Sequence, residues 1–426
     1  MSSDKVEIVL GAESKWMDNK FFEEQLQIYY KNNKVHVINF SKESATGKCE
    51  NFSSDIYRVN VSFSGSSEKR SSSGSEDRDI SHISLIVKQA ASDEWSLSAY
   101  EKFDFFNKEV EFYTDVAPKI NQKLSDLGES ELFAELIGVC KSKSIMILED
   151  LAAKGYRVLP AKEGFNFEET KAILKRIAIF HAACAVLQEE NPDIFANFKY
   201  GHLSREIDTF KDYYALTLDV VIETISGFGP DFAVYVEKLR RLRGEILERA
   251  RKTYDFNPDH FNTLNHDDVW STNFMIKTSD GSPEKPFENI KLIDFQFAFC
   301  ASPTIDLYYF LNSSVSHTCR PDRFDELVKF YYAQLIYFLK KMNYKKQIPT
   351  WPQFQAQYHE RRIFGFTMGC LIQPFMTNSK VEMSVEDSVK DNANSLKGRR
   401  AIFKSDNACK TLRKLIPYYD QLGTFD

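Results

Sequence analysis

The stretch that decides the fold is LNHDDVWSTNFMIK, residues 264–277. It places His266, Asp268 and Asn273 at the spacing H-x-D-x-x-x-x-N, just before a short apolar run with strand character. In phosphoryl transfer, a carboxylate on a rigid loop can orient an acceptor hydroxyl and take its proton. An amide oxygen five residues later can coordinate a hard cation such as Mg²⁺. The spacing therefore predicts Asp268 as the catalytic base, Asn273 as a metal ligand and His266 as a residue that orients the loop.

A second acidic position follows in KLIDFQFA, residues 291–298. Asp294 comes directly after two apolar residues and is expected at the end of a buried strand, where a carboxylate without a partner is costly. Phosphate-bridged Mg²⁺ would satisfy it, so Asp294 is predicted to be the second metal ligand. Twelve residues later, Asp306 in SPTIDLYYF is expected to brace the catalytic loop through hydrogen bonds.

Two charged residues nearer the N-terminus form the third signal. Lys88 lies in ISLIVKQA (83–90), which alternates like a strand, and Glu109 lies on the apolar stripe of a helix expected at about residues 100–118. Each is a charge on an apolar face and needs a partner. In the kinase fold, a strand lysine holds the α- and β-phosphates of ATP and a helix glutamate positions it. We therefore expect these two side chains to pair.

The order of predicted elements indicates the fold class. Strands cluster before about residue 150, and mainly helical patterns follow it, at 168–189, 203–254 and 321–342. This order predicts an α+β, protein-kinase-like fold of two lobes, a β-rich N-lobe (1–147) and a mainly helical C-lobe (148–426), with the ligand expected in a cleft between them. The connecting backbone at Glu149, Asp150 and Leu151 is expected to meet the adenine.

One segment has a different composition from the rest. Residues 62–82 are dominated by Ser, Gly and charged residues, so they cannot bury enough apolar surface to order themselves. They separate the strand expected at 55–63 from the strand expected at 83–90. We therefore predict a flexible loop at 62–82.

Composition excludes several classes of protein. The chain has 426 residues, 55 basic and 61 acidic, and its net charge of −6 comes without a basic stripe, which argues against nucleic acid as the main partner. Seven cysteines without a CxxC pair indicate free thiols in a reducing compartment. No run of 18 apolar residues occurs, and the N-terminus does not resemble a signal peptide. These features predict a soluble cytoplasmic protein without a membrane partner.

The chain resembles the ecdysteroid-kinase-like family of insects, also called choline-kinase-like, in the aminoglycoside-phosphotransferase branch of the kinase fold. DFQ at 294–296 and Trp270 are typical of that family, whereas an APE segment and activation loop of protein kinases are missing. The resemblance implies an ATP- and Mg²⁺-dependent kinase that phosphorylates a hydroxyl of an apolar small molecule, an ecdysteroid-like steroid or a xenobiotic alcohol. The segments that carry it are ENFSSDIYRV (50–59), LIVK (85–88), FNKEVEFY (106–113), MILEDL (146–151), IAIFHAACAVL (177–187), HDDVWSTN (266–273) and LIDFQFAFCASPTIDLYYF (292–310).

The sequence departs from the family in two places. Asp267 replaces the glycine of the usual H-G-D, which places an extra negative charge beside the expected metal site, although Asp tolerates a positive φ better than most residues. The segment expected to cover the phosphates has only Gly47, so backbone N–H groups and Ser53 or Ser54 would have to take that role.

Two other functions stay open from the sequence. One is a choline- or aminoglycoside-type small-alcohol kinase, which would need a carboxylate-rich acceptor site. The other is a non-catalytic pseudokinase that binds a ligand; Asp267 favours it, and the intact catalytic and metal positions count against it. Aromatic residues of the C-lobe suit a ring-shaped acceptor and equally suit core packing. They are Phe324, Phe330, Tyr331, Tyr332, Tyr337 and Phe338.

Overall fold

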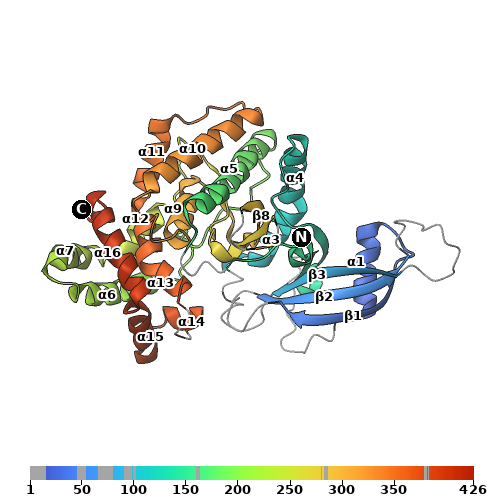
Figure 1. The fold of residues 1–426 in the computed structure, drawn as a ribbon, viewed down its shortest axis with the longest axis horizontal. Coiled ribbons are helices and arrows are strands. Elements are labelled where there is room, and N and C mark those ends of the chain that lie inside the picture. Colours follow the sequence, from blue (N-terminus) through green and yellow to red (C-terminus); the bar gives the residue numbers. More distant parts are fainter. Residues whose placement is uncertain are drawn as a thin grey trace, which may run out of the picture. The chain divides into compact units, whose positions relative to one another are not determined.

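The structure is a computed structural model that describes residues 16–45, 54–65, 80–90, 98, 102–159, 164–279, 281–282, 286–378, 381 and 383–426. The chain divides into two compact units. The first comprises Met1–Thr114 and Phe133–Tyr156, and the second comprises Asp115–Leu132 and Arg157–Asp426. Figure 1 shows that strands dominate the first unit and helices dominate the second, which confirms the α+β class.

The first unit is built on one antiparallel sheet of five strands in the order β1-β2-β3-β5-β4. Alternate residues of β2, such as Val59, Val61 and Phe63, are buried, as the alternating pattern requires. They pack with Phe22 and Leu26 of α1 in one apolar core. The elements are α1 (Asn19–Tyr30), β1 (His36–Ser44), β2 (Ser54–Ser64), β3 (Ile80–Ala90), α3 (Phe105–Glu111), β4 (Leu136–Cys140), β5 (Ile145–Glu149) and the 3₁₀ turn η3 (Leu151–Lys154).

The predicted bounds of the loop at 62–82 are wrong. Ser62–Ser64 belong to β2 and Ile80–His82 belong to β3, where Ser62 pairs with His82 and Ser64 with Ile80. β2 ends at Ser64, one residue beyond the predicted strand, and β3 begins at Ile80, three residues before the predicted one. Phe63, 1% exposed, anchors the end of β2 in the core. The remainder of the predicted loop, 66–79, lies outside the described residues.

The second unit is mainly helical, with α5 at its centre. Nearly every residue of α5 from Ile173 to Leu187 is buried, and Figure 1 shows α10 lying beside it. The predicted helical regions are confirmed. The helices are α4 (Ala117–Asp126), α5 (Phe167–Glu190), α6 (Tyr213–Ser226), α7 (Ala233–Leu242), α8 (Ile246–Lys252), α9 (Thr304–Ser313), α10 (Phe324–Lys341), α11 (Trp351–Glu360), α12 (Arg362–Thr367), α13 (Gln373–Met376), α14 (Val385–Val389), α15 (Ala393–Phe403) and α16 (Asp406–Gln421).

Two small antiparallel sheets of two strands each within this unit hold the predicted catalytic segment. β6 (Thr263–Asn265) pairs with β9 (Phe299–Ala301), and β7 (Phe274–Thr278) pairs with β8 (Phe287–Leu292). The H-x-D-x-x-x-x-N loop therefore runs from β6 to β7, and Asp294 follows the end of β8. Because each end of the loop continues into a paired strand, its backbone is fixed at both sides.

Three of the six aromatic residues considered for an acceptor pocket are core residues. Phe324, Tyr331 and Phe338 are buried on α10, which packs on α5. Tyr337, by contrast, is 54% exposed. Packing between the two helices therefore accounts for the buried members of this set without an acceptor.

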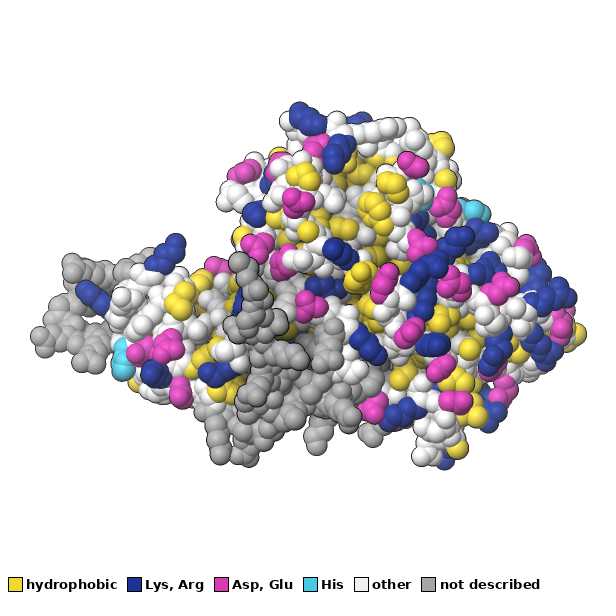
Figure 2. Space-filling model, turned by 180° about the vertical axis from the view of Figure 1, so that it is seen from behind, with side chains coloured by type: hydrophobic (Ala, Val, Ile, Leu, Met, Phe, Trp, Pro, Cys, Tyr) yellow, Lys and Arg dark blue, Asp and Glu magenta, His cyan; other side chains and the backbone are white. Residues whose placement is uncertain are grey.

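The surface charges and the cysteines of the described residues are as the amino-acid composition led us to expect. On the face shown in Figure 2, Lys and Arg side chains of the helical unit are interspersed with Asp and Glu. The six cysteines within the described residues are free thiols, as predicted, and Cys49 lies outside them. Over the described part of the chain, no helix combines the length and apolarity needed to cross a bilayer.

Candidate active site

Within the first unit, Lys88 of β3 and Glu109 of α3 form a buried ion pair. The Lys88 Nζ lies 2.6 Å from the Glu109 Oε2, and the two residues are only 8% and 4% exposed. The predicted contact between these residues is confirmed. Since removing one partner of a buried pair leaves an uncompensated charge, this pair fixes the position of the lysine ammonium group.

The residues expected to contact the adenine and phosphates lie at the ends of strands. Glu149 ends β5; its Oε1 accepts the Glu135 N–H at 3.1 Å, and its other oxygen pairs with Lys154. Leu151 begins η3, where the first N–H groups of a helical turn have no helical acceptor. Its main-chain N–H is thus suited to a ligand.

The Asp150 carboxylate is a structural group in this unit. It accepts hydrogen bonds from the Arg58 Nε at 2.7 Å and the Ser84 Oγ at 2.8 Å. Burial alone would raise the pKa of this carboxyl, but the bonds from Arg58 and Ser84 outweigh burial and lower it. The side chain therefore anchors the chain that follows β5.

Of the two serines expected near the phosphates, only one is described. Ser54 is the first residue of β2, and its buried Oγ has no hydrogen-bond partner among the described residues. A buried hydroxyl without a partner calls for an explanation, and an oxygen of a bound phosphate would supply one. Ser53 and Gly47 lie outside the described residues.

In the second unit, Asp306 of α9 braces the catalytic loop. Its Oδ2 accepts the His266 N–H at 2.8 Å and its Oδ1 accepts the Asp267 N–H at 2.9 Å, which confirms the predicted role. His181 of α5 lies behind it, with Nε2 3.0 Å from the same Oδ2 and Nδ1 2.6 Å from the Tyr331 hydroxyl. Both Asp306 and His181 are fully buried, so the hydrogen-bonded chain from Tyr331 through His181 to Asp306 supports the catalytic loop from the core.

His266 connects the catalytic loop to the segment that carries Asp294. Its Nε2 lies 2.8 Å from the Ile293 main-chain oxygen, and its ring packs on Phe295 with 4.4 Å between the ring centroids. The side chain is buried. This geometry supports a role in orienting the loop rather than in proton transfer.

The Asp268 carboxylate is held at both oxygens. Its Oδ1 accepts the Tyr309 hydroxyl at 2.5 Å and its Oδ2 accepts the Asn273 Nδ2 at 2.8 Å. Burial and the nearby Asp294 carboxylate raise the pKa of Asp268 to about 6, although the hydrogen bonds from Tyr309 and Asn273 oppose the shift. Most of this carboxyl is therefore ionised at neutral pH, yet it is more basic than an ordinary aspartate.

Sequence reasoning missed Tyr309. It lies three residues after Asp306 on α9, and residues three apart share a helix face. Once Asp306 is predicted to face the catalytic loop, Tyr309 is expected to face it as well. This spacing is the signal that could have found it.

The two predicted metal ligands have the chemistry that Mg²⁺ requires. The Asn273 Nδ2 donates to the Asp268 main-chain and Oδ2 oxygens, both at 2.8 Å, which leaves the amide oxygen to act as the ligand atom. Asp294 adopts a left-handed conformation, with φ of 71°, two residues after β8 ends at Leu292. Its charge disfavours ionisation of Asp268, and a bound cation would offset that repulsion. The residues therefore fit a divalent cation.

Phosphate oxygens would have to complete the coordination of such a cation. Within the described ranges, no group of three or more His, Cys, Asp or Glu side chains is arranged to hold a metal. Mg²⁺ commonly takes one or two protein ligands and the remainder from nucleotide phosphates and water. One carboxylate and one amide oxygen agree with that pattern.

Asp267, which replaces the family glycine, has a polar pocket of its own. Its φ is 63°, its Oδ1 accepts the Tyr254 hydroxyl at 2.5 Å, and its Oδ2 accepts the His202 main-chain N–H at 2.8 Å. The His202 Nδ1 lies 3.0 Å from the same Oδ2. A Cβ at Gly201 would come within 2.3 Å of that oxygen, so the approach requires glycine. The extra carboxylate is thus hydrogen-bonded by its own protein partners.

Two features define a kinase-like fold. One is the strand lysine paired with a helix glutamate. The other is the braced H-x-D-x-x-x-x-N loop, which is followed by a second acidic residue. The chain belongs to the ecdysteroid kinase-like family, whose model matches residues 48–344. This membership confirms the family resemblance and supports a small-molecule kinase in general terms.

The solved structures similar to this chain include three that each have low sequence identity to it. A candidate aminoglycoside phosphotransferase from Ralstonia eutropha has a TM-score of 0.44 and 12% identity, covering 95% of this chain and 98% of that one. A spectinomycin phosphotransferase, solved with ADP and spectinomycin, has a TM-score of 0.40 and 11% identity, with coverages of 95% and 99%. An amicoumacin kinase, solved with AMP-PNP and Ca²⁺, has a TM-score of 0.36 and 13% identity, with coverages of 91% and 93%. No curated protein matches the chain significantly.

Proposed function

We propose that this protein transfers the γ-phosphate of Mg·ATP to a hydroxyl group of a small, largely apolar molecule. The observation that carries the proposal is the Asp268 carboxylate. It is partly buried, hydrogen-bonded at both oxygens and placed on a loop braced by Asp306. A carboxylate held in this way is oriented before an acceptor arrives, and such positioning supplies much of the rate of phosphoryl transfer.

In this proposal each unit contributes its own residues. Lys88, held by Glu109, binds the α- and β-phosphates, while the main chain from Glu149 through Asp150 to Leu151 meets the adenine. Ser54, together with Ser53, covers the phosphates. The Lys88–Glu109 contact at 2.6 Å and the Ser54 hydroxyl without a partner among the described residues support these assignments.

The second unit supplies the catalytic chemistry. Asp268 accepts the proton of the acceptor hydroxyl, and Tyr309 and Asn273 keep its carboxylate in the required orientation. Asn273 and Asp294 would hold Mg²⁺, which neutralises charge on the phosphates when bound. A positioned general base contributes about 10²–10⁴-fold to rate.

The acceptor is proposed from the family. Membership of the ecdysteroid kinase-like family favours an ecdysteroid-like steroid or a xenobiotic alcohol over a choline- or aminoglycoside-type acceptor. The free thiols fit an enzyme that works in the cytoplasm. A pseudokinase is less well supported, because Tyr254 and His202 bond the Asp267 carboxylate.

The experiment is an ADP-release assay on purified protein with Mg·ATP and a panel of hydroxylated steroids, xenobiotic alcohols, choline and aminoglycosides. We expect release to depend on a steroid or xenobiotic alcohol and to be lost in Asp268→Asn. Stimulation by choline or an aminoglycoside alone would reject the acceptor class. Binding of ATP without any transfer would favour the pseudokinase.

A further inference from the structure

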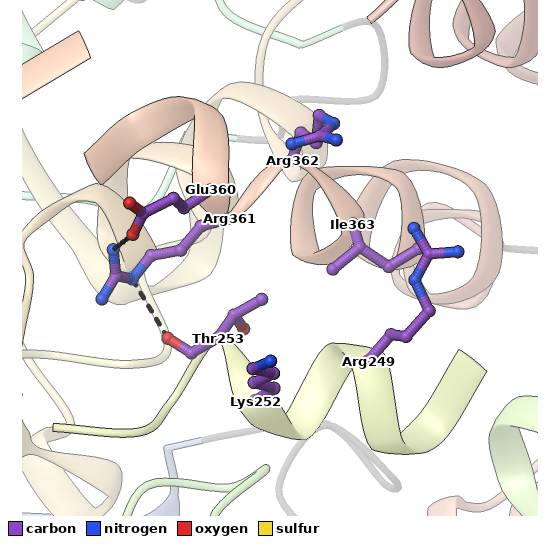
Figure 3. Close-up of a pocket in the computed structure, with 7 residues that line it drawn as sticks. All are labelled: Arg249, Lys252, Thr253, Glu360, Arg361, Arg362 and Ile363. Atoms are coloured by element: carbon purple, nitrogen blue, oxygen red, sulfur yellow. Dashed lines mark hydrogen bonds and ion pairs between the residues drawn. The ribbon is translucent and has the colours of Figure 1, made fainter. Parts of the chain in front are cut away.

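The helical unit contains a pocket of about 480 Å³ that is lined by none of the proposed catalytic residues. Figure 3 shows side chains from α8 facing side chains from the junction of α11 and α12 across an opening. The pocket is large enough for a small organic molecule, since ligand pockets span about 300–1,000 Å³. Its lining residues are Arg249, Lys252, Thr253, Glu360, Arg361, Arg362 and Ile363.

The lining carries four cationic side chains and one carboxylate. Glu360 pairs with Arg361, with 3.9 Å between its Oε2 and the guanidinium, and the same oxygen lies 3.4 Å from His260, but one carboxylate cannot balance four cations. Burial lowers the pKa of Arg361 to about 10, which still leaves the guanidinium charged at neutral pH. The pocket is therefore strongly positive.

Main-chain oxygens also fix the arginines in place. Arg361 donates to the Thr253 oxygen at 3.0 Å, as Figure 3 shows, and to the Gln357 oxygen at the same distance. Arg249 donates to the Thr424 oxygen at 2.7 Å, and Arg362 donates to the His359 oxygen at 3.0 Å. These carbonyls are neutral, so apart from the contact of Arg361 with Glu360 they leave the positive charge for another group. The cations are thus positioned before any ligand binds.

Two donors of the lining are still available. The exposed Lys252 ammonium has no hydrogen bond or ion pair with any other described residue. The Arg362 Nε is buried and also lacks a partner among the described residues. A buried donor without an acceptor calls for an explanation, and an oxygen of a bound anion would supply one.

We infer that this pocket binds a small molecule carrying a phosphate group. Fixed guanidinium groups match the oxygens of a phosphate, and a flexible lysine can close on the same group. Ile363 provides an apolar wall for the rest of the molecule. The volume exceeds the need of an inorganic ion, so an organic phosphate suits it better.

The pocket also adjoins the partners of the catalytic loop. Thr253 precedes Tyr254, which donates to Asp267, and Ile363 precedes Phe364, whose ring centroid lies 5.4 Å from that of Tyr254. An occupant that shifts either wall would act on the residue beside the catalytic base. If the proposed phosphotransferase function holds, the bound molecule would alter turnover.

The test measures binding alone, without nucleotide or metal. Inorganic pyrophosphate is titrated calorimetrically into the metal-free protein and two charge-reversal variants, Lys252→Glu and Lys329→Glu. Lys329 is an exposed lysine of α10 outside the pocket lining. Its reversal changes the net charge of the protein by the same amount and leaves the pocket lining unchanged. We expect Lys252→Glu to weaken binding about tenfold or more, and Lys329→Glu to change it less than about twofold.

A third variant, Arg362→Lys, keeps the charge but removes the buried Nε, and should weaken binding as well. Equal losses in Lys252→Glu and Lys329→Glu would show a non-specific charge effect and overturn the inference. Absence of saturable binding in the wild type would also overturn it. If pyrophosphate binding were lost only in a Lys88→Ala variant, the pyrophosphate would bind at the proposed nucleotide residues instead, and the inference would be overturned. None of these outcomes depends on an acceptor, so they are separate from the test of activity.

Discussion

Replacing Asp267 by the glycine usual in the family should destabilise this protein. In the structure the carboxylate accepts the Tyr254 hydroxyl at 2.5 Å and the His202 N–H at 2.8 Å, and its side chain is fully buried. Glycine would leave both donors without an acceptor, at roughly 1–3 kcal/mol each. It would also relieve the left-handed conformation, a gain of about 1 kcal/mol. The free energy of unfolding should therefore fall by about 1–5 kcal/mol.

The loss can be followed by thermal unfolding monitored with far-ultraviolet circular dichroism, which reports the helices of the second unit. At roughly 2 °C per kcal/mol for a unit of this size, Asp267→Gly should lower the midpoint by about 2–10 °C. Asp267→Asn is the matched control, because it keeps one acceptor oxygen and tolerates the positive φ, so it should lose less. A glycine variant as stable as the wild type would refute the reasoning, since backbone strain would then outweigh the hydrogen bonds.

Three further predictions concern the proposed catalytic residues. Lys88→Ala and Glu109→Ala should each lower turnover. In a double-mutant cycle, the loss of activation free energy in the double variant should be smaller than the sum of the two single losses by roughly 0.5–3 kcal/mol. Strict additivity would show that the two residues act independently. Asp294→Ala should remove the Mg²⁺ dependence of ATP affinity measured by calorimetry; unchanged affinity for Mg·ATP would show that it is not the metal ligand. Tyr309→Phe removes a hydrogen bond to a charged group, about 1.5–3 kcal/mol, and should lower kcat about 10-fold or more with ATP affinity intact; an unaltered kcat would exclude a positioning role.

The sequence predicts the residues whose chemistry conflicts with their surroundings. Lys88 and Glu109 are charges on apolar faces, and the structure pairs them at 2.6 Å. Asp306, in the segment SPTIDLYYF, was likewise expected to bond the catalytic loop, and it accepts two of its N–H groups. A charge in an apolar pattern needs a partner, so periodicity alone locates it.

Residues that act through tertiary contacts were not predictable in this way. His202 reaches Asp267 from 65 positions away in the sequence, and Gly201 beside it is needed because Asp267 and Phe299 both approach so closely. Neither lies in a periodic pattern or motif. The start of β3 was missed for a related reason, since Ile80–His82 pair with the end of β2 but Ile80 is 54% exposed, so no buried residue marks a strand in this polar segment.

Transfer of phosphate from ATP labelled at the γ-position to a hydroxylated steroid tests the central claim most directly. With Mg²⁺ present, the wild-type protein should place the label on the steroid hydroxyl. Asp268→Asn should bind ATP normally and transfer about 10²–10⁴-fold more slowly. Equal transfer by Asp268→Asn, or no transfer to any hydroxylated acceptor by a wild-type protein that binds Mg·ATP, would contradict the account.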